Sequence, residues 1–197
     1  VDLDDDNDYI ASLITVARTV CELEARRAFI TQTLELSLEM WPGDERLSMR
    51  PGLLYPQMMR STLQIWPRLG LPIEVPRPPL QSVVSLTYVD STGTTQTIPP
   101  SDYVVDAASE PGRVLLGYNK TWPSAVLQPG PAIKLRYVAG YGDMAVQVPD
   151  IYKHAIRLLV GHFYENREEV VVQAGVSAVR LPMAVESLLL LDRGWEG

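Results

Sequence analysis

Prolines and glycines are concentrated in the middle of the chain, and this uneven distribution constrains the fold more than any other feature. Most of the 16 prolines and 13 glycines in the 197 residues fall between Pro42 and Pro149. Proline lacks a backbone N–H and glycine favours turns, so this part of the chain cannot form long helices. The two ends carry apolar residues at helical spacing instead. The sequence therefore predicts helical ends around a turn-rich middle.

The N-terminal part predicts one amphipathic helix over residues 8–27. Apolar side chains recur there every three or four residues, which places them on one helical face. They are Ile10, Leu13, Ile14, Ala17, Val20, Cys21 and Leu23. Asp8 is suited to cap the N-terminus, and Arg26 and Arg27 complement the dipole at the C-terminus. Because Cys21 lies on the apolar face, we interpret it as a small buried hydrophobic residue and not as a reactive thiol.

The C-terminal part predicts two further helices. The first begins at Pro149, in a position suited to the first helical turn, and ends between Asn166 and Glu169. The second begins near Pro182 and is rich in leucine. Residues 170–179 lie between them and are apolar but contain Gly175, so the pattern leaves open whether they form a short strand or a flexible link.

The middle of the chain predicts several short strands. Residues 33–40 alternate strictly between apolar and polar side chains, the pattern of a half-buried strand. Further strands are expected at residues 63–66, 73–75, 83–89, 96–98, 103–106, 113–116 and 133–138. Turn residues at 91–93 and 110–112 separate strands, and the proline-rich residues 76–79 fit an extended connector.

Together these patterns predict an α+β fold. We expect a small α-helical bundle, formed by residues 1–30 and 145–197, with an antiparallel β-rich insertion at residues 31–144.

Composition excludes several classes of function. The net charge is -7, with 24 acidic and 17 basic residues, whereas static binding to nucleic acid needs a stripe of Lys and Arg. One cysteine cannot form an internal disulfide. No apolar run approaches the roughly 20 residues of a membrane helix, and the acidic start is the reverse of a signal peptide. We expect a soluble cytoplasmic protein without a cofactor.

Residues that could carry catalysis or bind a metal do not form a recognisable motif. His154 and His162 are eight residues apart, whereas a helical metal pair prefers three or four. Glu165, Glu168 and Glu169 could supply a general acid and base, but a solvated or interface face fits their place at a helix end better. Residues 140–143 contain two glycines but lack the spacing of a phosphate-binding loop, so we expect a turn there.

Trp195 is the aromatic residue whose position suggests a partner. It follows Arg193 close to the end of the chain, where little local core is available to bury it. Trp and Arg are enriched at protein interfaces. Contact with a partner and packing on its own domain both remain open for Trp195, whereas Trp41, Trp66 and Trp122 are expected to pack in the core or its loops.

A succession of short motifs resembles the head-to-tail adaptor (connector) family of tailed bacteriophages and gene transfer agents. The motifs occur in the family's order at residues 76–83, 88–90, 102–106, 111–113, 122–123, 137–142, 148–149, 161–168 and 181–182. Each motif alone is short, but their colinear order covers nearly the whole chain. The most extended ones read Pro-Arg-Pro-Pro-Leu-Gln-Ser-Val and Gly-His-Phe-Tyr-Glu-Asn-Arg-Glu.

The resemblance implies a structural virion protein and no catalysis. Members of this family form a ring, usually a dodecamer, that docks on the portal protein after DNA packaging, extends the DNA exit channel and presents a platform to the tail stopper or terminator protein. Such a protein is made in the cytoplasm of the bacterial host and resides in the neck of the particle. C-terminal segments often contact the portal. The residues that this implication singles out are Leu188, Leu189, Leu191, Arg193 and Trp195.

The acidic balance of the chain fits such a channel. Basic side chains would hold the DNA phosphates, whereas an acidic lumen lets DNA slide through without specific binding. We therefore expect Glu165, Glu168 and Glu169, or the N-terminal aspartates, to supply residues that face the channel. A ring needs two different complementary patches on each subunit, for which the β insertion and the helical face are candidates. Two alternatives are a tail-side stopper or terminator and a packaging-associated hydrolase, which would need a convergent polar site.

Overall fold

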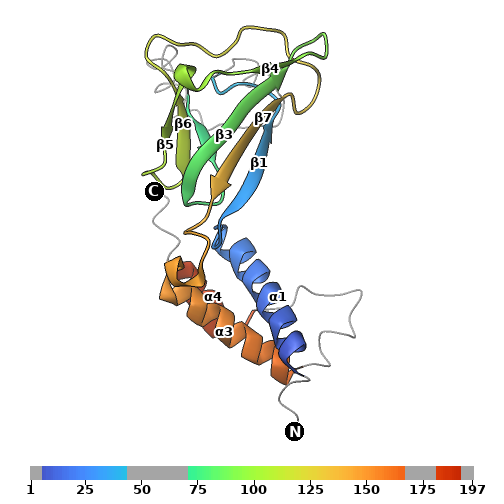
Figure 1. Ribbon diagram of the computed structural model, residues 1–197, viewed down its shortest axis with the longest axis vertical. Helices are drawn as coiled ribbons and strands as arrows, with labels where there is room; N and C mark the ends of the chain where they lie inside the picture. Colours follow the sequence, from blue (N-terminus) through green and yellow to red (C-terminus); the bar gives the residue numbers. More distant parts are fainter. Residues whose placement is uncertain (1–5, 44–70, 167–180, 192–197) are drawn as a thin grey trace, which may run out of the picture. The chain divides into compact units, whose positions relative to one another are not determined.

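The computed structural model describes residues 6–43, 71–166 and 181–191 (Figure 1). Backbone contacts divide the chain into two compact units. One contains residues 1–31 and 140–197, and the other contains residues 32–139. The boundaries expected from the sequence, after residue 30 and before residue 145, lie close to these. We call the two parts the helical unit and the β unit.

The helical unit contains α1 (Asn7–Ala25), α3 (Asp150–Glu165) and α4 (Met183–Leu191). Each helix packs apolar residues into a shared core, as the spacing predicts. Two residues expected on the apolar face of α1 are an exception: Ile14 is 49% and Leu23 is 56% exposed, because they lie outside the part of α1 that packs against α3 and α4. The core that they share is formed by Leu13, Ala17, Cys21, Ala25, Phe29, Val148, Tyr152, Ala155, Leu159, Phe163, Val185 and Leu189. No helix among the described residues is long and apolar enough to cross a membrane.

The ends of α1 and α3 differ slightly from the sequence prediction. The N-cap of α1 is Asp6 and not Asp8, and its side chain makes no capping hydrogen bond. At the other end Arg26 adopts a left-handed conformation, and its N–H bonds to the carbonyls of Glu22 and Leu23. Pro149 is the N-cap of α3, one residue before the first helical turn.

α1 and α3 run in opposite directions. The hydroxyl of Tyr164, near the end of α3, donates to Oδ2 of Asp6 at the start of α1 over 2.7 Å. At their other ends the rings of Phe29 and Tyr152 stack with centroids 4.3 Å apart. These contacts hold the two helices together at both ends.

The two chain segments that lead out of the helical unit are bonded to each other. The N–H of Tyr141 donates to the carbonyl of Phe29, and the N–H of Thr31 donates to the carbonyl of Gly142, both over 3.0 Å. Gly140 has φ +132°, and an added Cβ would lie 2.6 Å from the carbonyl carbon of Ile30. Glycine is therefore required there both by backbone conformation and by space.

The β unit contains two antiparallel sheets. The first has the strand order β1-β7-β3-β4 and the second β2-β6-β5. The strands are β1 (Gln32–Leu38), β2 (Ile73–Val75), β3 (Leu80–Val89), β4 (Thr95–Thr97), β5 (Tyr103–Asp106), β6 (Gly112–Leu116) and β7 (Ile133–Ala139). Figure 1 shows β7 between β1 and β3 in the first sheet.

Alternation of inward and outward side chains, clearest along β1, β2 and β7, creates the core of the β unit. Leu36 of β1 is opposite Leu135 of β7, which is opposite Leu86 of β3. Leu86 and Leu135 are fully buried. The second sheet comes close to the first at Gly112, where an added Cβ would lie 2.5 Å from Cβ of Leu80. A larger residue than glycine would therefore force β6 away from β3.

The observed fold corrects two expectations, the emphasis on a helical bundle and the extended connector at residues 76–79, and leaves two others outside the described residues. The α+β composition is as expected, but the emphasis on a small helical bundle is wrong, because two substantial sheets form a unit with its own core. The proline-rich connector at residues 76–79 is bent, with Arg77 at φ +59°. The strand expected at residues 63–66 and the conformation of residues 170–179 lie outside the described residues.

Candidate assembly surfaces

The acidic residues expected to face a channel begin at the end of α3. Glu165 is exposed in its last turn. Asn166 closes the helix, because its N–H and its side-chain Nδ2 both donate to the carbonyl of His162, over 3.0 and 2.8 Å. Glu168 and Glu169 lie outside the described residues. The channel-facing role of this group stays a prediction.

The leucines of α4 do not all face outward. Leu189 is only 1% exposed and packs in the core of the helical unit, so its side chain is not available to a portal protein. Leu188 is half-buried against the same core, whereas Leu190 is 43% exposed. Leu189 is therefore removed from the candidate interface. The side chains of Leu191, Arg193 and Trp195 lie outside the described residues.

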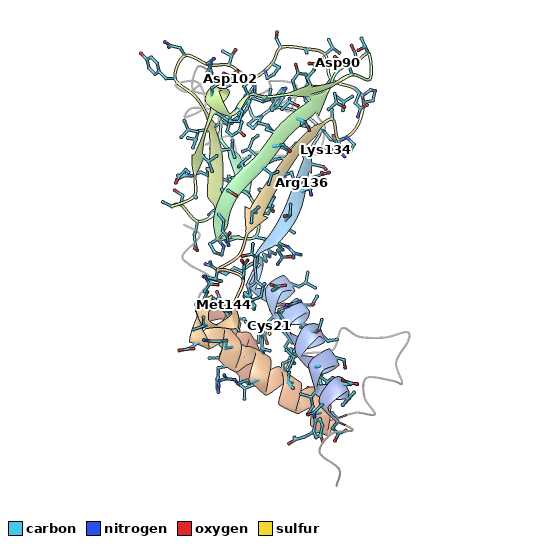
Figure 2. All side chains as sticks on the ribbon, in the orientation of Figure 1. Cys21, Asp90, Asp102, Lys134, Arg136 and Met144 are labelled. Carbon is cyan, nitrogen blue, oxygen red and sulfur yellow. The ribbon has the colours of Figure 1, made fainter. Side chains whose placement is uncertain are left out.

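Cys21 is fully buried on the apolar face of α1, which confirms its interpretation as a core residue (Figure 2). Burial, assisted by the nearby charge of Glu22, raises the pKa of the thiol to about 11. Because the thiolate is the nucleophile and the metal ligand, Cys21 is unreactive at neutral pH.

The described residues provide no assembled catalytic or metal centre. They contain no group of three or more His, Cys, Asp or Glu side chains that could hold a metal ion. A depression on the β unit offers one carboxylate, that of Glu39, and no second titratable group. Its lining is Glu39, Met40, Leu127, Gln128, Pro129 and Gly130.

Two charged residues are buried at the end of α1. The sequence analysis did not single out Glu22, and it treated Arg27 as a cation that complements the helix dipole and not as a buried residue. Glu22 is 7% exposed, and its Oε1 accepts a hydrogen bond from the N–H of Phe29 over 2.8 Å. Arg27 is 8% exposed, and its guanidinium donates to the hydroxyl of Tyr141 over 3.3 Å. The sequence signal that could have indicated the burial of Glu22 is its position, next to the apolar Cys21 and one turn before the end of the helix.

Aspartates in the loops of the β unit are engaged in hydrogen bonds and ion pairs that shape these loops. Asp90 accepts hydrogen bonds from the hydroxyl and the N–H of Thr92 and from the N–H of Thr94, and these bonds lower its pKa. The pKa of Asp102 is lowered by its hydrogen bond and ion pair with Lys120, whose Nζ lies 2.7 Å away. Figure 2 labels both aspartates. Lowered pKa values keep these carboxylates ionised and unsuited to act as general acids.

The outer face of the first sheet is polar. Lys134 and Arg136 stand out on β7, its second strand, and Figure 2 labels both. Nζ of Lys134 lies 3.3 Å from Oε1 of Glu35 on the neighbouring β1. Two cations, one of them paired, are far fewer than a stripe that binds DNA requires.

Two exposed helical faces have the same residue spacing. On α1, the residues Ser12, Val16, Thr19 and Leu23 are all exposed, and we call them the α1 stripe. On α3, the residues His154, Leu158, Gly161 and Glu165 are all exposed, and we call them the α3 stripe. In both stripes the steps along the chain are four, three and four residues. That spacing keeps four side chains on one face of a helix, as in the seam of a coiled coil.

The fold is similar to that of chains in gene transfer agent particles. A chain of the virion of a native gene transfer agent particle matches with TM-score 0.61 and 18% identity, over 93% of this chain and 76% of that one. A chain from the neck of the native particle, computed with C12 symmetry, matches with TM-score 0.60 and 18% identity, over 95% and 83%. A chain from the neck of the empty particle, computed with C6 symmetry, matches with TM-score 0.62 and 19% identity, over 97% of this chain and 80% of that one.

At these identities the similarity is one of fold. It extends over both the helical unit and the β unit, because at least 93% of this chain is covered in each of the three comparisons. No protein-family model matches the sequence. No curated protein sequence matches it either.

Proposed function

We propose that this chain is a structural protein of the neck of a gene transfer agent or tailed-phage particle, and that it is the head-to-tail adaptor of that neck. The observation that carries the proposal is the extent of the fold similarity, which covers 95% and 97% of this chain in the two neck structures. The colinear motifs of the adaptor family support the same assignment independently of the structure.

The proposed role is mechanical and not enzymatic. The chain would form a ring, a dodecamer as in the adaptor family, between the portal protein and the stopper or terminator of the tail. The C12 symmetry used for one of the similar necks supports this number. DNA would pass through the lumen without specific binding, which the net charge of -7 favours. The protein would be made in the host cytoplasm and reside in the particle neck.

The test is to mix the purified protein with the portal protein encoded beside it and to image the product by electron microscopy. A second ring on the tail-facing side of the portal is the expected result. A portal that stays bare at saturating protein would overturn the adaptor role and favour a tail-side stopper or terminator, for which the tail proteins would be the next partner to mix.

The contribution of the C-terminus is tested with a truncation that spares the core. Removing residues after Leu181 would delete the core residues Val185 and Leu189 and would confuse unfolding with lost docking. Ending the chain after Leu191 keeps α4 and removes Arg193 and Trp195. Unchanged circular dichroism together with lost docking would assign the portal contact to residues 192–197, whereas unchanged docking would exclude them.

A further inference from the structure

The α1 stripe is exposed, but it has no charged side chain and no free hydroxyl proton with which to bind water or a partner. Val16 and Leu23 are 50% and 56% exposed. The two polar members use their hydroxyl protons within the helix, since Ser12 donates to the carbonyl of Tyr9 over 2.6 Å and Thr19 to that of Thr15 over 2.9 Å. The stripe contains no charged residue. It therefore has the character of a contact face whose partner is absent.

The α3 stripe lacks a side chain at one of its two central positions, Gly161, and we call this gap the hollow. Gly161 is exposed, and an added Cβ there would meet no atom within 4 Å. Glycine weakens a helix relative to alanine, and none of the described residues of the helical unit requires it at this position. Leu158, one turn earlier, is 39% exposed. A glycine of this kind allows another helix to approach closely.

We propose that the α1 stripe of one copy packs antiparallel against the α3 stripe of the next copy and that this contact builds the ring. The inference rests on the proposed function, which requires each subunit to carry two different complementary faces. The steps of four, three and four residues are the same when a stripe is followed in either direction. Each member of one stripe therefore meets a member of the other when the helices are antiparallel. The pairs are Ser12 with Glu165, Val16 with Gly161, Thr19 with Leu158, and Leu23 with His154.

The sizes of the paired side chains are complementary. Val16, a projecting branched side chain, lies opposite Gly161, and Leu158 lies opposite the smaller Thr19. Large residues therefore face small ones in the two central layers, which is the condition for interdigitation.

The antiparallel direction follows from the geometry of a ring. α1 and α3 are antiparallel within one copy, as the contact between Tyr164 and Asp6 shows. Neighbouring copies in a ring are related by a rotation of one twelfth or one sixth of a turn in the symmetries of the similar necks. Such a rotation changes the direction of a helix by at most the same angle, so α1 of one copy still runs roughly opposite to α3 of the next. A parallel pairing is not compatible with such a ring.

Charge at the end of the stripes favours the same arrangement. Arg26 is exposed one turn beyond Leu23, and Asp150 lies one turn before His154. The antiparallel alignment brings these two residues together. The Asp150 side chain is 97% exposed although it pairs with Lys153, so its carboxylate has room for a second cation. Because the α1 stripe itself is uncharged, two copies that are both acidic overall can meet there without repulsion.

The experiment joins the two stripes by disulfide bonds between copies. In the full-length double variant Val16→Cys, Gly161→Cys, each chain can link to two neighbours, so oxidation at pH 8 in the presence of the portal protein should give a ladder of covalent oligomers on a denaturing gel. The native thiol does not interfere, since burial raises the pKa of Cys21 to about 11. The matched control is Ile14→Cys, Gly161→Cys, because Ile14 is 49% exposed on the same helix but off the stripe.

Electron microscopy of the same samples separates the possible outcomes. A ladder from the Val16 pair and none from the Ile14 pair supports the inference. Rings without a ladder, or equal ladders from both pairs, overturn it while leaving the proposed function intact. If the wild-type protein forms no ring, the proposed function fails and the inference fails with it.

A second variant distinguishes assembly from folding. Gly161→Leu should raise the thermal midpoint of the free subunit, because leucine favours a helix and the added side chain meets open space. The same change should weaken ring formation by about tenfold by filling the hollow opposite Val16. Ring formation at the wild-type concentration by a well-folded Gly161→Leu protein would contradict the proposed contact.

Discussion

Glu22 and Arg26 close the C-terminal end of α1 by different means. Arg26 turns the chain by adopting a left-handed conformation with φ 54°. Glu22 then fixes the segment that follows, because its buried carboxylate accepts the N–H of Phe29, three residues beyond the turn. The ring of Phe29 thereby reaches its stacking position on Tyr152. A residue that the sequence presents as one more surface glutamate is thus part of the core.

Replacing Glu22 by alanine should destabilise the helical unit. The substitution leaves the buried N–H of Phe29 without its acceptor, which costs about 1–3 kcal/mol. Glu22→Gln keeps a carbonyl oxygen at the same position and should cost less than the alanine variant. Urea denaturation followed by circular dichroism measures both, and equal stability of wild type and Glu22→Ala would show that the hydrogen bond does not matter.

At the scale of elements, the hairpin turns of the β unit are set by side chains as much as by glycine. Between β5 and β6, Asp106 accepts hydrogen bonds from the hydroxyl of Ser109 over 2.6 Å and from its N–H over 3.1 Å. Arg113, at the start of β6, donates to the same hydroxyl and lies 3.4 Å from the carboxylate. The turn is therefore held by a small network that links both strands.

The contribution of Asp106 should depend on pH. Its bonds to Ser109 lower its pKa from the ordinary value of 3.8. A carboxylate with a lowered pKa stabilises the folded state above its unfolded pKa, and this stabilisation is lost as the pH falls through the lowered value. Asp106→Asn should therefore be less stable than wild type at pH 7, with a difference that shrinks below pH 3.8. Denaturation of both proteins at several pH values measures this, and a difference that does not change with pH would refute it.

The positions of the helices and strands were more predictable from the sequence than the way in which these elements pair and pack. Residues 73–75 and 103–106 were predicted as strands and are β2 and β5, because alternation and turn residues are local signals. The division into two sheets could not be predicted, since alternation assigns a face to each residue but not a partner to each strand. The approach of Gly112 to Leu80 depends on that pairing. For the same reason the exposed Leu190 of α4 could not be distinguished from Leu189, which the other helices bury.

The spacing of the two stripes was present in the sequence but could not be recognised there. Val16 and Leu23 are apolar like the core residues around them, and only the packing of α1 on α3 decides which apolar residues stay exposed. Gly161 likewise resembles any other glycine until the space around its Cα is known.

At the scale of the whole molecule, the chain consists of a helical unit interrupted by a complete β unit. The β unit has two sheets and its own buried residues, among them Val75, Leu86, Val114 and Leu135. Its first and last residues, Gln32 and Ala139, are direct partners in the pairing of β1 with β7. The unit therefore begins and ends at one place.

Residues 32–139 should fold when they are produced alone. Cutting the chain at Gln32 and Ala139 leaves the pairing of β1 with β7 and the core of both sheets intact. We expect a β-type circular dichroism spectrum and a cooperative thermal transition. Leu135→Ala in the same fragment is the control, and it should lower the midpoint because it removes a fully buried side chain from the central strand. A fragment without a cooperative transition would show that the β unit needs the helices.

The pairing of Gln32 with Ala139 also has a genetic consequence. An inserted unit whose first and last residues are neighbours can be removed or exchanged by recombination at two points in a gene. The rest of the chain can then keep its fold, because the two cut ends already lie side by side. Relatives can thus acquire different β units while inheriting the same helices. If the chain is the neck protein proposed above and its helices carry the contacts between copies, new attachment specificities can evolve while the number of subunits in the ring is preserved.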